Sequence, residues 1–146
     1  MIFLIAILSY LIGAIPFAYI LIKLYAKQDI RSIGSGNVGA MNSYETTGKK
    51  WIGIIVFILD MLKGLIAVIL TYFITNKNSQ LILVSIIFSV LGHNYSIFLK
   101  FKGGRGLSTA VGVASLTFPL ALSIWGIFWI IVKFPLKKDL FIANSI

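Results

Sequence analysis

Two glycine-rich runs contain the residues of this chain that could bind an anion. The first, over residues 34–42, reads GSGNVGAMN, and the second, over residues 100–106, reads KFKGGRG. Glycines leave backbone N–H groups approachable and permit φ > 0, so such runs can fold into a concave nest of donors. Ser35, Asn37 and Asn42 add polar side chains to the first run, and the second run adds positive charge. Together the two runs indicate a phosphate site.

Several familiar kinds of site do not fit these runs. Neither run matches the GxxxxGK[ST] nucleotide-binding pattern or a strand-linked dinucleotide fingerprint, so ATP and NAD are disfavoured. There is no cluster of His and carboxylates for a metal, and no Cys for thiol catalysis. His93 lies between Gly92 and Asn94, just before the second run, and is a candidate for proton transfer. The competing interpretation is structural, which is the commoner role for a lone histidine beside a membrane surface.

The composition is that of an integral membrane protein. Of the 146 residues, 59% are hydrophobic and 12% charged, and the mean hydropathy is +1.00. The net charge of +9 comes from 13 basic residues that cluster in short segments between apolar runs. That pattern is typical of membrane orientation and contact with anionic headgroups rather than of nucleic-acid binding. We therefore expect an all-α membrane bundle that forms a single domain over residues 1–146, with the lipid bilayer as a partner and no nucleic acid.

The apolar runs predict about five membrane-inserted helices, over residues 2–22, 51–75, 81–99, 107–118 and 119–132. The last two could instead be one tilted helix of about 39 Å, which gives four spans. The hairpin places eleven basic residues on one side and one on the other, whereas the single helix places eight against four, so the charge rule favours the hairpin. The same rule predicts an N-terminus outside and both glycine runs in the cytoplasm.

Asp60 and Lys63 lie inside the second predicted span, at a spacing that places them on one helical face. They can neutralise each other there. One interpretation is a structural pair that fixes helix packing, and the other is a polar face turned toward the site.

Five motifs in order resemble the PlsY family of bacterial membrane acyltransferases. They are GSGNVGAMN at 34–42, GKK at 48–50, DMLKG at 60–64, LGHNY at 91–95 and FKGGRG at 101–106. The resemblance implies acyl transfer from acyl phosphate to glycerol 3-phosphate, giving lysophosphatidic acid and phosphate in phospholipid synthesis. It also implies a helical bundle in the bacterial plasma membrane with a cytoplasmic active site. No metal or cofactor is expected, and neither acyl-CoA nor acyl-carrier protein is used. The oligomeric state stays open.

The resemblance also implies roles for particular residues. Ser35, His93 and Arg105 are the expected catalytic residues. The expected phosphate-binding residues are Gly34, Gly36, Asn37, Gly39, Asn42, Asn94, Lys102, Gly103, Gly104 and Gly106. An acyl phosphate is already an activated anhydride, so the protein must chiefly orient two anions and stabilise developing charge. Either His93 or a substrate phosphate oxygen could accept the hydroxyl proton.

Some positions depart from the family pattern. Met41 replaces the usual Thr, Arg105 the usual Lys, and Glu45 an Arg that binds phosphate. Glu45 either faces the pocket or pairs with Lys49 at i+4. The sequence after Lys133 does not follow the family pattern, and the last spans with their third motif are not matched. The alternatives are therefore a truncated or degenerate relative without activity, or a small anion-binding transporter. The transporter would need polar residues at mid-depth in several spans, and only Asp60 and Lys63 qualify.

Overall fold

The structure, a computed structural model, describes residues 1–133, and these contain helices and no strand. The chain divides into two compact units, Met1–Val113 and Ala114–Ile146. Residues 134–146, which the expected single domain includes, lie outside the described residues. The helices are α1 (Ile2–Ala14), α2 (Phe17–Ala26), η1 (Ile30–Ser32), α3 (Ala40–Thr47), α4 (Lys50–Ile74), α5 (Ser79–Asn94), η2 (Ile97–Leu99), α6 (Leu107–Thr117) and α7 (Pro119–Lys133).

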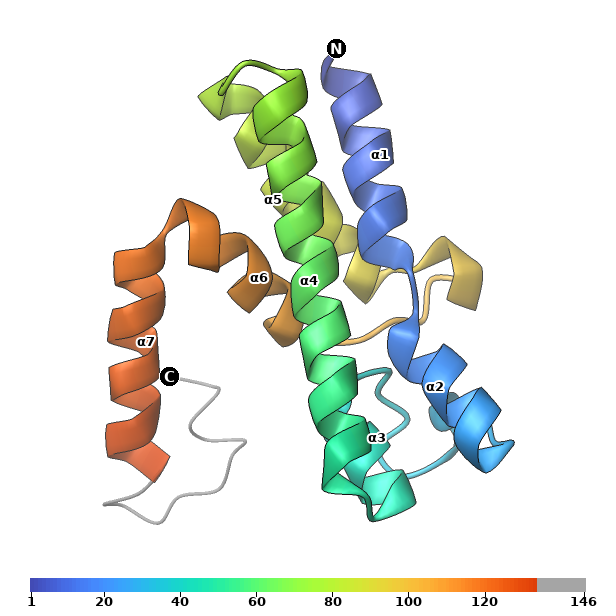
Figure 1. Cartoon of the computed structure of the whole chain (residues 1–146). Helices are drawn as coiled ribbons and strands as arrows, with labels where there is room; N and C mark the ends of the chain where they lie inside the picture. Colours follow the sequence, from blue (N-terminus) through green and yellow to red (C-terminus); the bar gives the residue numbers. More distant parts are fainter. Residues whose placement is uncertain (134–146) are drawn as a thin grey trace. The chain divides into compact units, whose positions relative to one another are not determined.

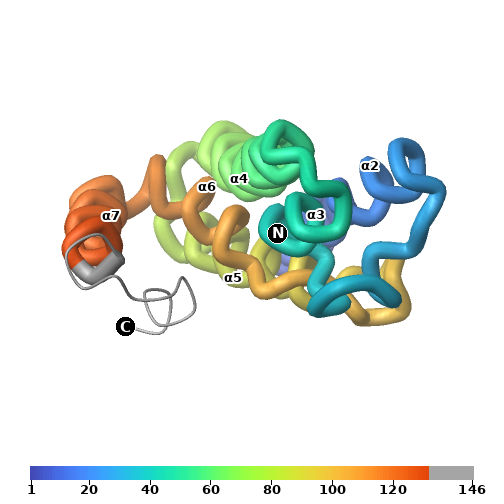
Figure 2. Tube along the Cα trace, turned by 90° about the horizontal axis from the view of Figure 1, so that it is seen from below, coloured from blue at the N-terminus to red at the C-terminus, as the bar shows by residue number. Residues whose placement is uncertain are grey.

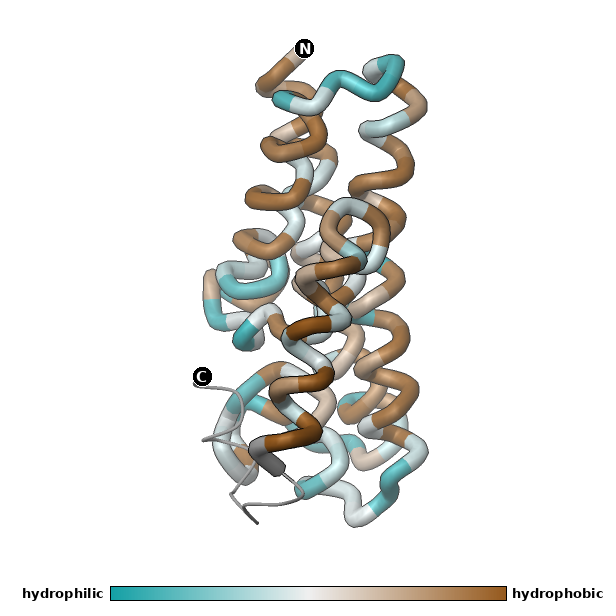
Figure 3. The backbone as a smooth tube through the Cα atoms, turned by 90° about the vertical axis from the view of Figure 1, so that its left-hand side faces the viewer, coloured by the Kyte–Doolittle hydropathy of each residue, from teal (hydrophilic) through white to brown (hydrophobic). Residues whose placement is uncertain are grey.

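Three of these segments are long and apolar enough to cross a bilayer: Ile2–Ala26, Lys50–Ile74 and Ser79–Leu99. Shorter apolar helices follow. Large apolar side chains such as Phe3, Leu24 and Phe73 are exposed, whereas many polar side chains are buried. Figure 3 shows hydrophobic residues along the long helices and hydrophilic residues in the turn between α4 and α5. This inverted distribution is that of an all-α integral membrane protein, as predicted.

Helices α1, α4 and α5 pack side by side in the first unit (Figure 1). Glycines allow α1 and α5 to approach closely, because a Cβ at Gly13 would collide with the carbonyl of Ser89. The Ser9 hydroxyl also donates a buried hydrogen bond of 2.9 Å to the Ser85 Oγ atom. Close packing of small residues and a buried polar pair thus replace the hydrophobic effect that holds a bundle together in water.

The first predicted span is two helices rather than one. Pro16 has no N–H and cannot donate to the preceding turn, so α1 ends at Ala14 and α2 begins at Phe17. The two helices are joined by the extended residue Ile15, which has φ −56° and ψ 118°. The prediction of one helix over residues 2–22 is wrong at Pro16, whereas Ile2–Ala26 as a whole is one candidate membrane span.

The apolar run over residues 107–132 is divided at the proline on which the hairpin interpretation depends. Helix α6 ends at Thr117 and α7 begins at Pro119. The hairpin itself, and the side of the membrane to which it returns, stay predictions.

A short amphipathic helix follows the first glycine run. Helix α3 lies against the beginning of α4, as the view from below shows (Figure 2). Its neighbours form an apolar cluster around Val38, which packs among Ala18, Ile22, Ile52 and Leu99. This cluster anchors the end of the first glycine run to α2, α4 and η2.

Candidate active site

The buried side chain of Asn42 holds the backbone of the first glycine run in place by hydrogen bonds. Its side chain is 1% exposed, and its Nδ2 atom donates to the carbonyls of Ile30 at 3.2 Å, Ile33 at 3.1 Å and Asn37 at 3.0 Å. Its Oδ1 atom accepts from the backbone N–H of Ser35 at 3.1 Å. Every polar atom of the Asn42 side chain is therefore engaged by the loop backbone. Asn42 therefore supports the loop backbone, and its contact with phosphate stays a prediction.

The first run is shaped so that a helix begins at its end. Gly34 and Gly36 have φ values of +57° and +69°, a region that L side chains rarely adopt. The run then enters α3 at Ala40, with Gly39 as an N-cap that has no side-chain hydrogen bond. The first N–H groups of a helix lack partners within the helix, and the helix dipole favours negative charge there. The predicted anion site thus coincides with a helix start.

The second run is held against the end of α5 by its backbone. The N–H of Gly103 donates to the carbonyl of Asn94, and the N–H of Gly104 to that of His93, both at 3.1 Å. Gly106 has φ +80°, and α6 begins at the next residue, Leu107. This run therefore also leads into the start of a helix.

The two runs meet at Gly104, although they lie far apart in the sequence. A Cβ at Gly104 would lie 2.5 Å from the carbonyl oxygen of Val38 and would collide with Nε2 of His93. Glycine is therefore the residue that allows this approach. The sequence interpretation that both runs build one site agrees with this contact.

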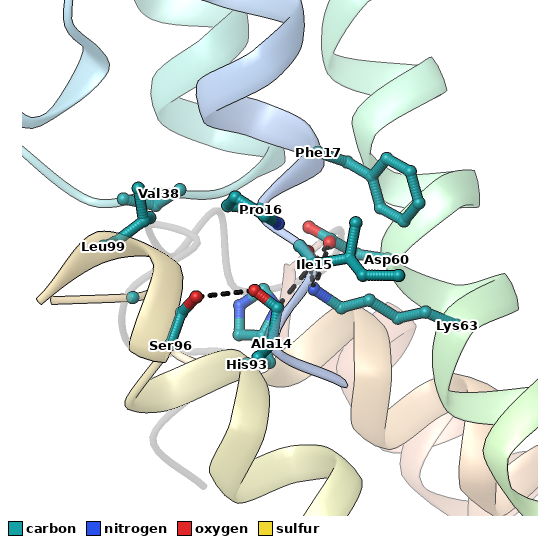
Figure 4. Close-up of a pocket in the computed structure, with 11 residues that line it drawn as sticks. Ala14, Ile15, Pro16, Phe17, Val38, Asp60, Lys63, His93, Ser96 and Leu99 are labelled. Carbon is teal, nitrogen blue, oxygen red and sulfur yellow. Dashed lines mark hydrogen bonds and ion pairs between the residues drawn. The ribbon is translucent and has the colours of Figure 1, made fainter. Parts of the chain in front are cut away.

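A cluster of buried polar groups lies beside this contact, and two of them donate hydrogen bonds to backbone carbonyls at the break between α1 and α2. The carbonyl of Ala14 accepts from the Ser96 hydroxyl at 2.6 Å, and the carbonyl of Ile15 accepts from Lys63 Nζ at 2.8 Å (Figure 4). Because Pro16 interrupts the helix, these carbonyls have lost their helical donors. An unsatisfied carbonyl inside a bilayer costs several kcal/mol. Ser96 therefore satisfies the Ala14 carbonyl, and Lys63 adds a second donor to the Ile15 carbonyl, which also accepts from the N–H of Phe17 at 3.2 Å.

Asp60 connects the lysine to the histidine. Lys63 Nζ lies 2.8 Å from Asp60 Oδ1, and His93 Nδ1 lies 3.6 Å from the same oxygen. The approach of Lys63 is ionic rather than a well-directed hydrogen bond, since both oxygens of Asp60 lack a hydrogen-bond partner among the described residues. Asp60, Lys63 and His93 are 1%, 3% and 7% exposed. The predicted pairing of Asp60 with Lys63 on one helical face is thus present, and the pair points into the bundle.

Positive side chains differ in whether they are free to meet a ligand. Lys102 and Arg105 are exposed and make no ion pair within residues 1–133. Arg31, near the first run, is instead held by Asp29, with Nη2 at 2.6 Å from Oδ2, and lies over the ring of Tyr19. Its hydrogen bond lowers the pKa of Asp29 to about 2, and the pKa of Arg31 is raised in turn. The second run therefore supplies the free charge.

Other predicted residues lie at the surface of the site or beneath it. The Ser35 side chain is exposed and makes no hydrogen bond to the described residues, so it is available to a ligand. Asn94 Oδ1 is buried without a partner among those residues and lies beneath Gly106. Glu45 is exposed on α3 and does not pair with Lys49 within the described part of the chain. The physical reason is that α3 ends at Thr47, so the two residues do not share a helix.

Sequence reasoning did not identify the partners of Lys63, Ser96 and Val38. One signal was available for the first two. A proline inside an apolar run leaves backbone carbonyls that need donors, and a lysine in a later span is one candidate. No local pattern indicated the contact between the Val38 carbonyl and the second run.

The fold and these loops define a helical integral membrane protein with a candidate anion site. The family profile described as glycerol-3-phosphate acyltransferase matches residues 3–139. The chain belongs to this glycerol-3-phosphate acyltransferase family, as the motifs predicted.

Individual relatives agree with the family assignment. The glycerol-3-phosphate acyltransferase of Anaplasma phagocytophilum is 44% identical over 124 residues, which are 84% of this chain and 63% of the relative. That of Staphylococcus haemolyticus is 42% identical over 144 residues, 94% of this chain and 71% of the relative. The crystal structure of PlsY, an integral membrane glycerol 3-phosphate acyltransferase, in its glycerol 3-phosphate form has a TM-score of 0.81 and 36% identity. That match covers 90% of this chain and 65% of the PlsY chain, so the chain spans less than two thirds of several of its relatives.

Proposed function

We propose that this chain transfers a fatty acyl group from acyl phosphate to glycerol 3-phosphate, giving lysophosphatidic acid and phosphate. The observation that carries the proposal is the meeting of the two glycine runs at Gly104, each of which leads into the start of a helix. Two such loops suit two substrates that both carry phosphate. Membership of the glycerol-3-phosphate acyltransferase family supports the same reaction.

The reaction needs little covalent help from the protein. A hydroxyl oxygen of glycerol 3-phosphate attacks the acyl carbon, a new ester bond forms, and the bond from that carbon to the phosphate oxygen breaks. The hydroxyl proton ends on the departing phosphate or on water. What the site must supply is close placement of two anions that repel each other, together with stabilisation of the oxyanion. Backbone N–H groups at the starts of α3 and α6 can supply part of that stabilisation.

Charged and hydroxyl side chains complete this assignment. Arg105 and Lys102 are cations of the second loop that make no ion pair within residues 1–133, and we assign them to phosphate neutralisation. Ser35 presents a free hydroxyl on the first loop and is assigned to the phosphate or the oxyanion. A charge-assisted hydrogen bond is roughly twice as strong as a neutral one, so Arg105 should contribute more than Ser35.

We also propose that both loops face the cytoplasm of a bacterium and that the N-terminus lies outside. Basic residues flank both loops, whereas the turn between α4 and α5 contains the single lysine Lys77. This asymmetry follows the positive-inside rule. Single cysteines at Lys49, Ser79 and Ser108 test it, because only the cysteine at position 79 should react with an impermeant reagent added outside. Labelling at 49 or 108 with protection at 79 would reverse the orientation.

The experiment that tests the function is lysophosphatidic acid formation by the purified full chain. Acyl phosphate and acyl-CoA are compared as donors, with glycerol 3-phosphate as acceptor. We expect product with acyl phosphate as donor and none with acyl-CoA. Arg105→Ala should lower kcat/KM about tenfold or more, and Arg105→Lys should recover most of that loss. Lys77→Ala is the matched control, since Lys77 is an exposed cation outside both loops.

Two results would contradict the proposal. A folded chain that forms no product from either donor is not an acyltransferase of this kind. Binding of glycerol 3-phosphate without turnover would favour the alternative of an inactive relative. The negative charge of Glu45, at the position of the family's phosphate-binding Arg, supports that alternative. Full turnover by Arg105→Ala would show that the second loop does not bind phosphate.

A further inference from the structure

We infer that His93 is a positioning residue, whose imidazole ring sets the distance between the two phosphate loops by holding Gly104. This inference deepens the proposed function and rests on it for its kinetic test. It concerns how the site is kept in shape, and it removes His93 from the candidates for proton acceptor.

The surroundings of the ring turn both nitrogens toward groups of the protein. Nε2 faces the backbone of Gly104 so closely that a Cβ there would collide with it. Nδ1 faces Asp60 Oδ1 at 3.6 Å, and the side chain is 7% exposed. A general base must come within hydrogen-bond reach of the proton that it removes. Both nitrogens of His93 are instead directed at groups of the protein.

The space beside the ring is also too small for a substrate. His93, Asp60, Lys63 and Ser96 line a cavity of about 10 Å³, which Figure 4 shows beneath the helix break. That volume is about one water molecule. Neither glycerol 3-phosphate nor an acyl phosphate can enter it, so the cavity is not a place where His93 meets a hydroxyl.

The ring is instead the last member of a chain of contacts that begins in another helix. Lys63 donates to the Ile15 carbonyl at the break between α1 and α2 and lies 2.8 Å from Asp60. Asp60 faces His93, and His93 faces Gly104. On its other side, Gly104 approaches the carbonyl of Val38 in the first loop. The buried cluster therefore connects the rigid part of the bundle to the point where the two loops meet.

A backbone hydrogen bond adds a second connection between the same residues. The N–H of Gly104 donates to the carbonyl of His93 at 3.1 Å. The backbone of His93 thus fixes Gly104 along the chain, while the ring limits how far the loop can move toward α5. Loss of the ring should loosen the second loop without removing any group that contacts the substrates.

This geometry predicts a particular pattern in the kinetics. His93→Ala in the full chain should raise the KM for glycerol 3-phosphate or acyl phosphate about tenfold and leave kcat within about threefold. His93→Gln should recover most of the loss, because its amide can reach the position of Nε2. Gly104→Ala should resemble His93→Ala, since its Cβ pushes the ring and the Val38 carbonyl apart. Ser85→Ala is the control, because Ser85 is buried on the same helix and loses one hydrogen bond far from the loops.

The opposite pattern would overturn the inference. If His93 were the general base, both His93→Ala and His93→Gln would lower kcat about 100-fold or more, and the limb of the pH profile that reports the base would disappear. Asp60 and Lys63 are the other titratable groups that line the cavity, so variants at those positions identify any limb that remains.

A second measurement does not depend on turnover. Trypsin cleaves after Lys102 and Arg105, which are exposed in the second loop. We expect His93→Ala to speed cleavage there about fivefold or more, while cleavage at Lys27 outside the site stays as in the unchanged chain. If the unchanged chain forms no product, the proposed function fails and this assay still tests the positioning role. Equal cleavage rates in the two proteins would refute that role.

Discussion

Replacing Asn42 should disorganise the first glycine run more than the loss of an ordinary buried amide would suggest. Its side chain contacts the carbonyls of Ile30, Ile33 and Asn37 and the N–H of Ser35. Ile30 belongs to the short helix η1, and the other three groups belong to the loop that follows it. Asn42→Ala removes all four contacts at once, and Asn42→Asp keeps the acceptor but replaces the donors with a carboxylate that faces three carbonyls.

The size of the effect follows from the hydrogen bonds. Nδ2 has two hydrogens to share among three carbonyls, and Oδ1 accepts one bond, so Asn42 contributes about three full hydrogen bonds. At about 1 kcal/mol each, Asn42→Ala should lower the free energy of unfolding by about 3 kcal/mol. Asn42→Asp should cost at least as much, because it adds repulsion between like partial charges.

The measurement is unfolding of the purified chain in detergent, followed by helical circular dichroism. Ser43→Ala is the matched control, since Ser43 is the next residue, is fully buried and donates one hydrogen bond, to Gly39 at 2.9 Å. Its expected loss is about 1 kcal/mol. If Asn42→Ala loses no more than Ser43→Ala, the side chain does not organise the loop in the way described.

Three further predictions test separate parts of the molecule. Glu45→Arg should lower the KM for glycerol 3-phosphate about tenfold at low salt, since it replaces a negative charge with a positive one beside the loop, and an unchanged KM would place Glu45 outside the pocket. Gly13→Val should weaken the bundle by about 2 kcal/mol or more in the same unfolding assay, because its side chain collides with the carbonyl of Ser89, and unchanged stability would contradict the close approach. The pKa of Asp29 is lowered from 3.8 to about 2 by Arg31, so its contribution to stability should be complete above about pH 4 and disappear as the pH falls toward 2. An NMR titration of the Asp29 carboxyl measures this directly, and an ordinary pKa would refute the pairing.

Much of this architecture follows from residue periodicity and charge. The apolar runs predicted the long helices because about 20 consecutive apolar residues are needed to cross a bilayer. Asp60 and Lys63 were expected on one helical face, and they form the ion pair. The glycine runs were expected to share a site because topology places both at one end of the bundle, and Gly104 and Val38 are in contact.

Other features depend on contacts that no local pattern contains. Asn42 has the composition of a phosphate ligand, but its burial gives all its polar atoms to the loop backbone. His93 has the composition of a catalytic base, but both of its nitrogens face protein groups. Whether a polar side chain faces ligand or backbone is decided by the packing of helices that lie far apart in the sequence. Residue types alone therefore indicated where the candidate site lies, but they did not indicate which side chains face a ligand and which support the backbone.

The hydrogen bonds at the interruption between α1 and α2 can form only after later parts of the chain have been translated. The segment with the Pro16 break leaves the ribosome before α4 and α5. At that stage the Ala14 carbonyl lacks its partner Ser96, and the Ile15 carbonyl accepts only from the N–H of Phe17, at 3.2 Å. Their partners, Lys63 and Ser96, are translated 48 and 82 residues later. Until those residues arrive, the break is stable only where water or the insertion machinery can reach it. The helices translated later thus complete the membrane integration of the first span. In a chain stalled on the ribosome before residue 96, the backbone groups at the break should stay accessible to water.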